Sequence, residues 1–127
     1  MDGRLLGRMI ALGRLGLGVF ATAAPDLAAA AWVGRDAAGS PATRVLGHAL
    51  AGRDVALAGG ALLARSTEDT RRWVVAAAIA DAGDALATVA SWAILPKAGR
   101  RLVLAASAGA AVLGAVAAAT MAGDQRP

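Results

Sequence analysis

Two aspartates inside a long apolar segment are the residues of this sequence best placed to do chemistry. Asp81 and Asp84 lie within residues 71–95, whose other side chains are mostly Ala, Val, Ile, Leu and Trp. Two carboxylates one helical turn apart repel each other, which makes it easier for one of them to hold a proton. Two interpretations follow: structural carboxylates paired with arginines, or a carboxylate pair that exchanges protons or binds a ligand.

The strongly polar side chains of this segment share one face of the predicted helix. Residues three, seven and ten positions apart point in nearly the same direction on a helix. A carboxylate at bilayer depth costs about 2.5 kcal/mol or more, so this face is expected to turn toward protein or water. The face, called the polar stripe below, consists of Asp81, Asp84, Thr88 and Ser91.

The composition favours a lipid environment over water. The chain has 127 residues, 57% of them hydrophobic and only 3% aromatic, and it contains a single Glu (Glu68) and a single Lys (Lys97). Soluble domains are typically ~45–50% apolar, and soluble helices carry charged residues on their outer faces. Residues 1–127 are therefore predicted to form one integral membrane domain; the alternative is a soluble Ala-rich bundle.

The positive charge of the chain points to lipid head groups. The formal net charge is +4, and the basic residues gather at the ends of apolar segments, as at Arg71 and Arg72. No basic helix face with aromatic stacking residues accompanies them, so no nucleic-acid partner is predicted, whereas the lipid bilayer is. The chain has no Cys and one His, so disulfides and thiolate metal sites are excluded, and no cofactor or metal is predicted.

Four apolar segments are long enough to cross a bilayer, which takes about 20 helical residues. The predicted fold is all-α: a four-helix transmembrane bundle with a short interfacial helix after the first span. Ser40 and Ser66 are predicted to cap the second and third spans. The spans cover approximately residues 5–24, 42–64, 72–95 and 102–123.

Residues 24–40 are predicted to lie outside the spans. Pro25 should end or kink the first helix, after which Asp26 can cap a short interfacial helix over residues 27–33. Trp32 favours that interfacial location, and residues 34–40 are predicted to form a polar loop. The first span itself resembles a signal peptide only superficially, because Arg14 interrupts its apolar run.

Charged residues also fall near the middle of the first two spans. Arg14 shares its face with small residues (Gly7, Ala11, Gly18 and Ala21) and is predicted to point into the bundle; the alternative is snorkelling to the surface. In the second span, the face of Arg53 carries Ala49, Gly52, Ala56 and Gly60, and is predicted to pack closely. Adjacent residues do not face each other on a helix. Arg53 is therefore expected to pair with Asp81 or Asp84, and Asp54 with Arg14.

Three further features leave alternatives open. His48 is expected to make a hydrogen bond near the interface or to relay protons. In the fourth span, Ser107, Ala111, Ala115 and Ala119 form a face of small residues, and such Gly/Ala faces allow a homo-oligomer or a membrane-protein partner. Lys and Arg are nearly balanced between the two sides; we predict a multi-pass protein of the cell membrane with both termini cytoplasmic.

The charged pattern of the second and third spans resembles a known family. Gly52-Arg53-Asp54-x-x-Leu57-x-Gly59, followed by Asp81-x-x-Asp84, is similar to the pattern of small uncharacterised four-helix membrane proteins of actinobacteria and fungi, which carry a Gly-x-Arg-Asp motif in the second span. Ala51 stands where that family often has Gly. The resemblance implies the architecture and no activity. The Ala-, Gly- and Arg-rich composition suits a high-GC bacterium.

Arg14, Arg53, Asp54, Asp81 and Asp84 thus form a predicted intramembrane charge network, with His48 nearby, and three functions compete for it. A structural or accessory membrane protein uses the network as ion pairs for folding. A proton-coupled small transporter, acting as an oligomer, changes the protonation of Asp81 or Asp84. A membrane-embedded enzyme uses a protonated Asp as an acid on a lipidic substrate and needs an apolar cavity beside the stripe.

Overall fold

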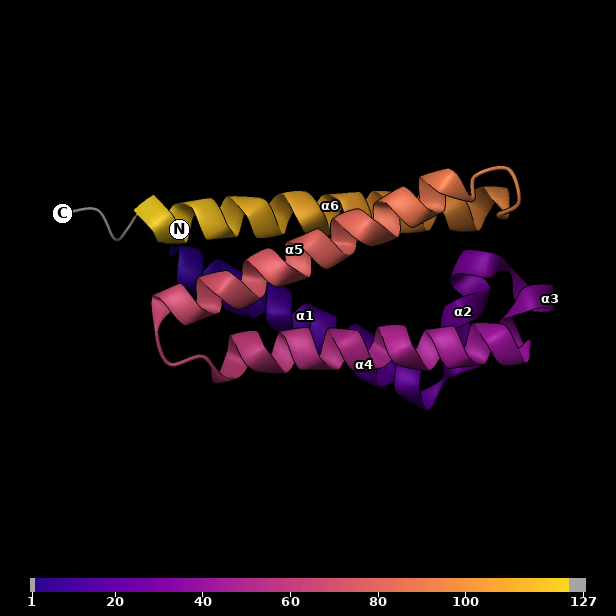
Figure 1. The fold of residues 1–127 in the computed structure, drawn as a ribbon, viewed down its shortest axis with the longest axis horizontal. Coiled ribbons are helices and arrows are strands. Elements are labelled where there is room, and N and C mark those ends of the chain that lie inside the picture. Colours follow the sequence, from indigo (N-terminus) through magenta and orange to yellow (C-terminus); the bar gives the residue numbers. More distant parts are fainter. Residues whose placement is uncertain (1, 124–127) are drawn as a thin grey trace.

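Helices make up nearly all of the computed structural model, which describes residues 2–123 (Figure 1). No strand occurs among these residues, so the prediction of an all-α protein is confirmed. The six helices are α1 (Gly3–Ala23), α2 (Pro25–Val33), α3 (Arg35–Ala38), α4 (Pro41–Leu63), α5 (Thr67–Ala90) and α6 (Lys97–Gly123).

Most helix starts follow from local capping. The hydroxyls of Ser40 and Ser66 accept hydrogen bonds from the backbone N–H of Thr43 and Asp69, which confirms both as N-caps. Pro25 stands at the first turn of α2, where its missing N–H costs nothing. The prediction for Asp26 is wrong, because this residue lies inside the first turn of α2 and binds Arg44 instead of capping the helix.

Two segments differ from the sequence-based expectations. Residues 34–40 are not a simple loop, because α3 forms one helical turn there after Gly34, whose φ of 87° lets the chain change direction. Residues 91–95 were predicted to continue the third span, but α5 ends at Ala90. Pro96 disfavours the helical conformation at Leu95, and the last N–H groups bond in tighter turns, as from Trp92 to the carbonyl of Val89.

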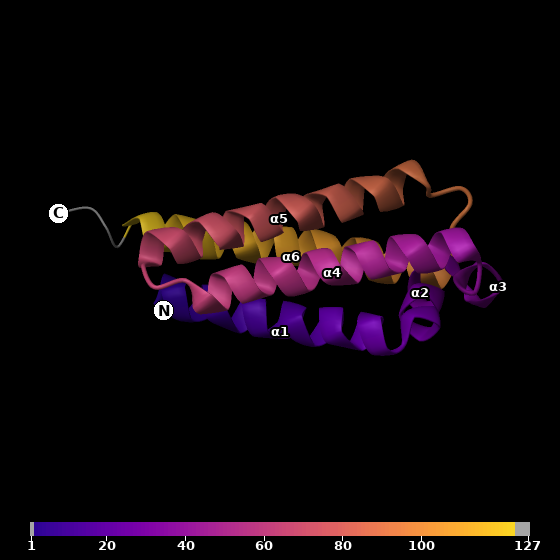
Figure 2. The ribbon, with the colours of Figure 1, turned by 60° about the horizontal axis from the view of Figure 1, so that its bottom comes forward.

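The four long helices lie side by side, with α2 and α3 at one end (Figures 1 and 2). Helix α5 packs most extensively on α6 and α1 on α4, and contacts of α4 with α5 and of α1 with α6 join these two pairs. The start of α1 and the end of α6 lie at the same end of the molecule, opposite α2 and α3.

Three of the described helices, α1, α5 and α6, are long and apolar enough to cross a membrane. Helix α4 has a similar length, but Arg44, His48, Arg53 and Asp54 lower its hydropathy. Many large apolar side chains on the long helices are exposed, such as Leu17 on α1 and Ile79 on α5. The chain is therefore compatible with a multi-pass membrane protein.

The best-packed core lies at the end of the molecule where α1 begins and α6 ends. Val74 of α5 and Met121 of α6 are nearly inaccessible there, together with Ala117 and Ala118. Of the predicted face of small residues on α6, Ser107 is buried and Ala111 is half-buried, whereas Ala115 and Ala119 are exposed. The buried face of α6 instead follows Ser107, Gly114, Ala118 and Met121, residues that share one side of the helix.

Candidate functional site

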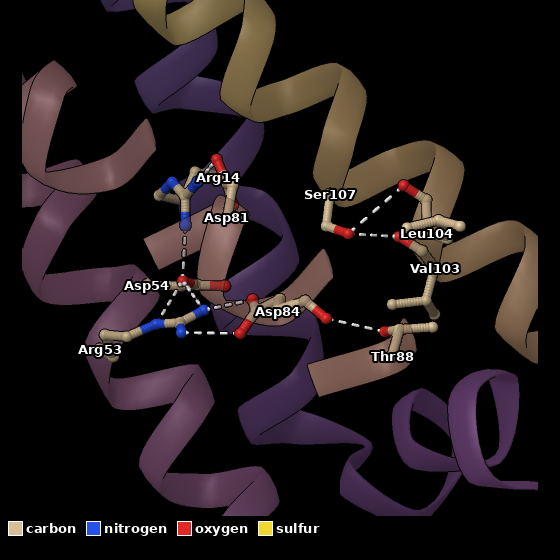
Figure 3. A network of polar contacts seen from close by, with 9 residues as sticks. All are labelled: Arg14, Arg53, Asp54, Asp81, Asp84, Thr88, Val103, Leu104 and Ser107. Atoms are coloured by element: carbon tan, nitrogen blue, oxygen red, sulfur yellow. Dashed lines mark hydrogen bonds and ion pairs between the residues drawn. The ribbon is translucent and has the colours of Figure 1, made fainter. Parts of the chain in front are cut away.

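Five charged residues from three helices form one connected network (Figure 3). Arg14 comes from α1, Arg53 and Asp54 from α4, and Asp81 and Asp84 from α5. These are the five residues singled out in the middle of the predicted spans. The structure therefore brings together side chains that are as many as 70 positions apart in the sequence.

One half of the network is buried. The Arg14 guanidinium donates through Nη1 to Asp54 Oδ1 at 2.7 Å and through Nη2 to Asp81 Oδ2. Only 8% of the Arg14 side chain and 9% of the Asp81 side chain are exposed. Arg14 thus points into the protein, as predicted, and its pairing with Asp54 is confirmed. Burial of this kind makes each charge dependent on its partner.

The other half is partly accessible. Arg53 forms a two-pronged pair with Asp84: Nη1 donates to Oδ1 at 3.0 Å and Nη2 donates to Oδ2 at 2.7 Å. The exposed fractions of these side chains are 30% and 20%. This geometry matches a planar guanidinium to a planar carboxylate. Of the two partners predicted for Arg53, the structure selects Asp84.

Asp54 joins the two halves through a single oxygen. Its Oδ1 accepts from Arg14 Nη1 and also from Nε and Nη2 of Arg53, at 3.2 and 3.1 Å. The expectation that the adjacent Arg53 and Asp54 do not meet is wrong, because the long Arg side chain bends back to its neighbour. The other oxygen, Oδ2, accepts no hydrogen bond from the described residues 2–123.

Close approach of α1 and α4 makes the buried half of the network geometrically feasible. A Cβ atom on Gly18 would lie 2.9 Å from Val55 Cγ2 and 3.1 Å from the Ala51 carbonyl oxygen, so any larger residue there would require a shift of α4 or of the Val55 side chain. The predicted small-residue face of α1 is confirmed, since Gly7 and Ala11 are buried beside Arg14.

The corresponding prediction for α4 is partly wrong: Gly60 does pack closely, since a Cβ atom there would overlap the Trp73 ring, but the other members of that face do not. Ala49, Gly52 and Ala56, which were assigned to a close-packing face around Arg53, are exposed. The buried residues of α4 are Ala51, Ala58 and Ala61, which lie on the side of Asp54. Helix α4 therefore presents Asp54 to its neighbours, and Arg53 reaches the network from the edge.

The remaining polar residues play unequal parts. Thr88 is fully buried, and its hydroxyl donates to the Asp84 carbonyl oxygen at 2.8 Å, so it is satisfied within its own helix. Ser91 is half-buried and lines the cavity described below. His48 is exposed and its Nδ1 lies 2.8 Å from the Arg44 carbonyl oxygen. The hydrogen bond expected of His48 is present, and the network described above does not include this residue.

An apolar cavity of about 740 Å³ opens beside the accessible half of the network. Side chains of α1, α2 and α4 form most of its wall, including Phe20, Trp32 and Leu50, and Asp84 contributes from α5. Arg53 and Asp54 complete its polar end. The sequence hypothesis of an enzyme required such a cavity, but the part played by α2 was missed, because nothing in the sequence shows that this helix folds back against α4.

The network carries an excess of negative charge. Three carboxylates face two guanidiniums, which leaves one formal negative charge. Within residues 2–123 no group of His, Asp and Glu side chains is arranged to hold a metal ion. The chemistry available is thus ion pairing, proton exchange at a carboxylate, or binding of an organic cation.

Comparison with protein families, with curated proteins and with solved structures finds no match to this chain. The network and the cavity are therefore the features that bear on its function.

Proposed function

We propose that this is a multi-pass membrane protein in which α1, α4, α5 and α6 all cross the bilayer and the ion-pair network fastens three of them together. Its primary role is structural or accessory. The observation that carries this proposal is that both guanidiniums bind carboxylates of other helices: Arg14 links α1 to α4 and α5, and Arg53 links α4 to α5.

The same contacts support α4 as a fourth crossing helix despite its lower hydropathy. Charged side chains at bilayer depth are tolerated where they face the protein interior and pair with one another. Arg53 and Asp54, which lie mid-helix, both have such partners. Arg44 lies in the first turns of α4, where a long side chain can reach the head groups.

The absence of cysteine in this chain allows a direct test of the fourth crossing. Single cysteines placed at Gly39, before α4, and at Arg65, after it, are both at exposed positions. A membrane-impermeant maleimide applied to sealed vesicles of one orientation should label one position, and label the other only after the membrane is opened. Labelling of both positions from the same side would overturn the proposal for α4. Cysteines at Asp2 and Gly123, the two ends of the described chain, give a second readout, because four crossings place them on the same side of the membrane and three crossings place them on opposite sides.

A second candidate is a proton-coupled small transporter acting as an oligomer, with Asp81 and Asp84 as the proton-exchanging groups. The observation favouring it is that the cavity reaches Asp84, which a purely structural network would not need. Infrared difference spectroscopy on reconstituted protein tests it. A protonated-carboxyl band should appear on acidification and disappear in Asp84→Asn or Asp81→Asn protein that still folds. Carboxylates that stay ionised at every pH where the protein is folded would contradict the transporter.

A further inference from the structure

The cavity combines an apolar wall with a charged end. The wall includes Leu17, Trp32 and Leu50, whereas Asp54 and Asp84 stand at one end with Arg53 between them. Its volume of about 740 Å³ lies within the roughly 300–1,000 Å³ of pockets that bind small molecules. A ligand that fills it would therefore need a large apolar body and one polar group.

The charge of that end selects the polar group. The network retains one formal negative charge after its guanidiniums have paired. Asp54 Oδ2 accepts no hydrogen bond from the described residues, although Asp54 lines the cavity. An anionic group would meet like charge in a medium of low dielectric constant, whereas a cation with N–H donors would compensate the charge and supply a bond to this oxygen.

We propose that the cavity binds an amphiphilic monovalent organic cation: a protonated amine whose N–H donates to the Asp54 carboxylate and whose apolar body packs against α1, α2 and α4. The proposal names a ligand class for the transporter candidate and concerns binding alone. Binding is measured on folded protein without transport, so failure of this proposal and failure of the proton-coupled mechanism are distinguishable.

Trp32 provides the reporter for the test, because it lines the cavity. The full chain is placed in nanodiscs of phosphatidylcholine, a lipid without net charge, and titrated with para-bromophenethylamine, whose bromine quenches tryptophan fluorescence on contact. Para-bromophenethyl alcohol is the uncharged comparison. The amine should quench in a saturable manner at about tenfold lower concentration than the alcohol, since a charge-assisted hydrogen bond separates them. In Trp32→Phe protein the saturable component should disappear.

Three further variants locate the site. Ala87→Phe places a large side chain in the cavity and should abolish saturable quenching. Ala105→Phe makes the same change at an exposed position of α6, outside the cavity wall, and should leave quenching unchanged. Asp54→Asn neutralises the excess charge, so the amine and the alcohol should then quench equally. If this variant fails to fold, the comparison of Ala87→Phe with Ala105→Phe still decides the location.

Three results would overturn the proposal. The first is equal quenching by amine and alcohol in the wild type, which would indicate simple partitioning into lipid. The second is saturable quenching that survives Ala87→Phe, which would place the amine elsewhere. The third is quenching of Trp32 by phosphatidylcholine with brominated acyl chains that phenethylamine, the same amine without bromine, does not relieve; this would make a lipid chain the occupant of the cavity.

Discussion

The ion pairs of Asp81 and Asp84 on α5 have the same chemistry and different surroundings. Asp81 and Asp84 are one helical turn apart, and each binds an arginine from another helix. In the Arg14–Asp81 pair the exposed fractions are 8% and 9%, whereas in the Arg53–Asp84 pair they are 30% and 20%. The comparison shows that three residues along one helix separate a pair enclosed by protein from a pair that borders a cavity.

The difference has a geometric cause. Around Arg14, the buried residues Gly7, Ala11 and Gly18 let α1 approach its neighbours closely. Asp84, by contrast, borders the cavity between α1, α2, α4 and α5. A buried pair holds its charges by mutual contact alone, while a pair at a cavity can exchange a partner for water or a ligand. These surroundings support the proposals that the first pair holds the helices together and that a ligand reaches the network on the side of the second pair.

Removing the arginine of each pair should have unequal effects. Arg14→Ala leaves Asp81 buried without its partner and should lower the free energy of unfolding by about 3 kcal/mol. Arg53→Ala leaves Asp84 beside the cavity, where water can solvate it, and should cost about 1 kcal/mol. The measurement is unfolding by SDS in mixed micelles, followed by tryptophan fluorescence.

Arg101→Ala, at an exposed position of α6, is the matched control and should leave stability unchanged. Equal losses for Arg14→Ala and Arg53→Ala would mean that burial does not distinguish the two pairs. The double variant Arg14→Leu with Asp81→Leu should recover most of the loss, because a buried ion pair can be replaced by apolar side chains at little cost.

Disturbing the close approach of α1 and α4 should destabilise mainly the buried half of the network. In Gly18→Ala the added methyl group meets Val55 and the Ala51 carbonyl oxygen, so the helices must move apart or strain. The expected loss is about 1 kcal/mol, because overpacking outweighs the gain in helix propensity. Gly16→Ala on the same helix has no atom within 4 Å of the new methyl group and should be neutral or slightly stabilising. Equal behaviour of the two variants in SDS unfolding would show that the helix spacing is not set at Gly18.

Local rules predicted much of the fold. The caps at Ser40 and Ser66 and the break at Pro25 depend on residues next to them in the sequence, and the structure agrees. Helical periodicity likewise placed Arg14 on an inward face and placed Asp81 and Asp84 on the side of α5 that meets the arginines. Pairing followed because a buried charge requires a partner of opposite sign and few candidates existed at the same depth.

Features that depend on which helices become neighbours were not predicted. The packed sides of α4 and α6 were not identified, because Ala and Gly occur all around these helices and periodicity alone does not distinguish the packed side. The sequence predicted a cavity only as something that the hypothesis of a membrane-embedded enzyme would need. Its wall needs α2 to lie against α4, a tertiary contact between segments whose sequences are both rich in alanine.

A third ion pair, formed by Arg44 and Asp26, extends the comparison to side chains that are about half exposed. Arg44 donates through Nε and Nη2 to both oxygens of Asp26, and these side chains are 55% and 48% exposed. The hydrogen bond from Arg44 holds the pKa of Asp26 below its usual range. Because the folded-state pKa is the lower one, the pair contributes fully at neutral pH and its contribution is lost as the pH falls through that pKa.

Breaking this pair by Asp26→Asn should therefore lower the free energy of unfolding least among the three ion pairs, since solvent and salt screen an exposed pair. SDS unfolding at neutral pH should be indistinguishable from wild type, while the carboxyl signal of Asp26 in NMR should titrate at lower pH in the wild type than in Arg44→Ala. Coincident titration in the two proteins would show that the pair does not form in solution. If Asp26→Asn instead lost as much free energy of unfolding as Arg14→Ala, the strength of these ion pairs would not follow their burial. The distinction between a buried pair that stabilises the helix contacts and a pair that is accessible from the cavity depends on that relation.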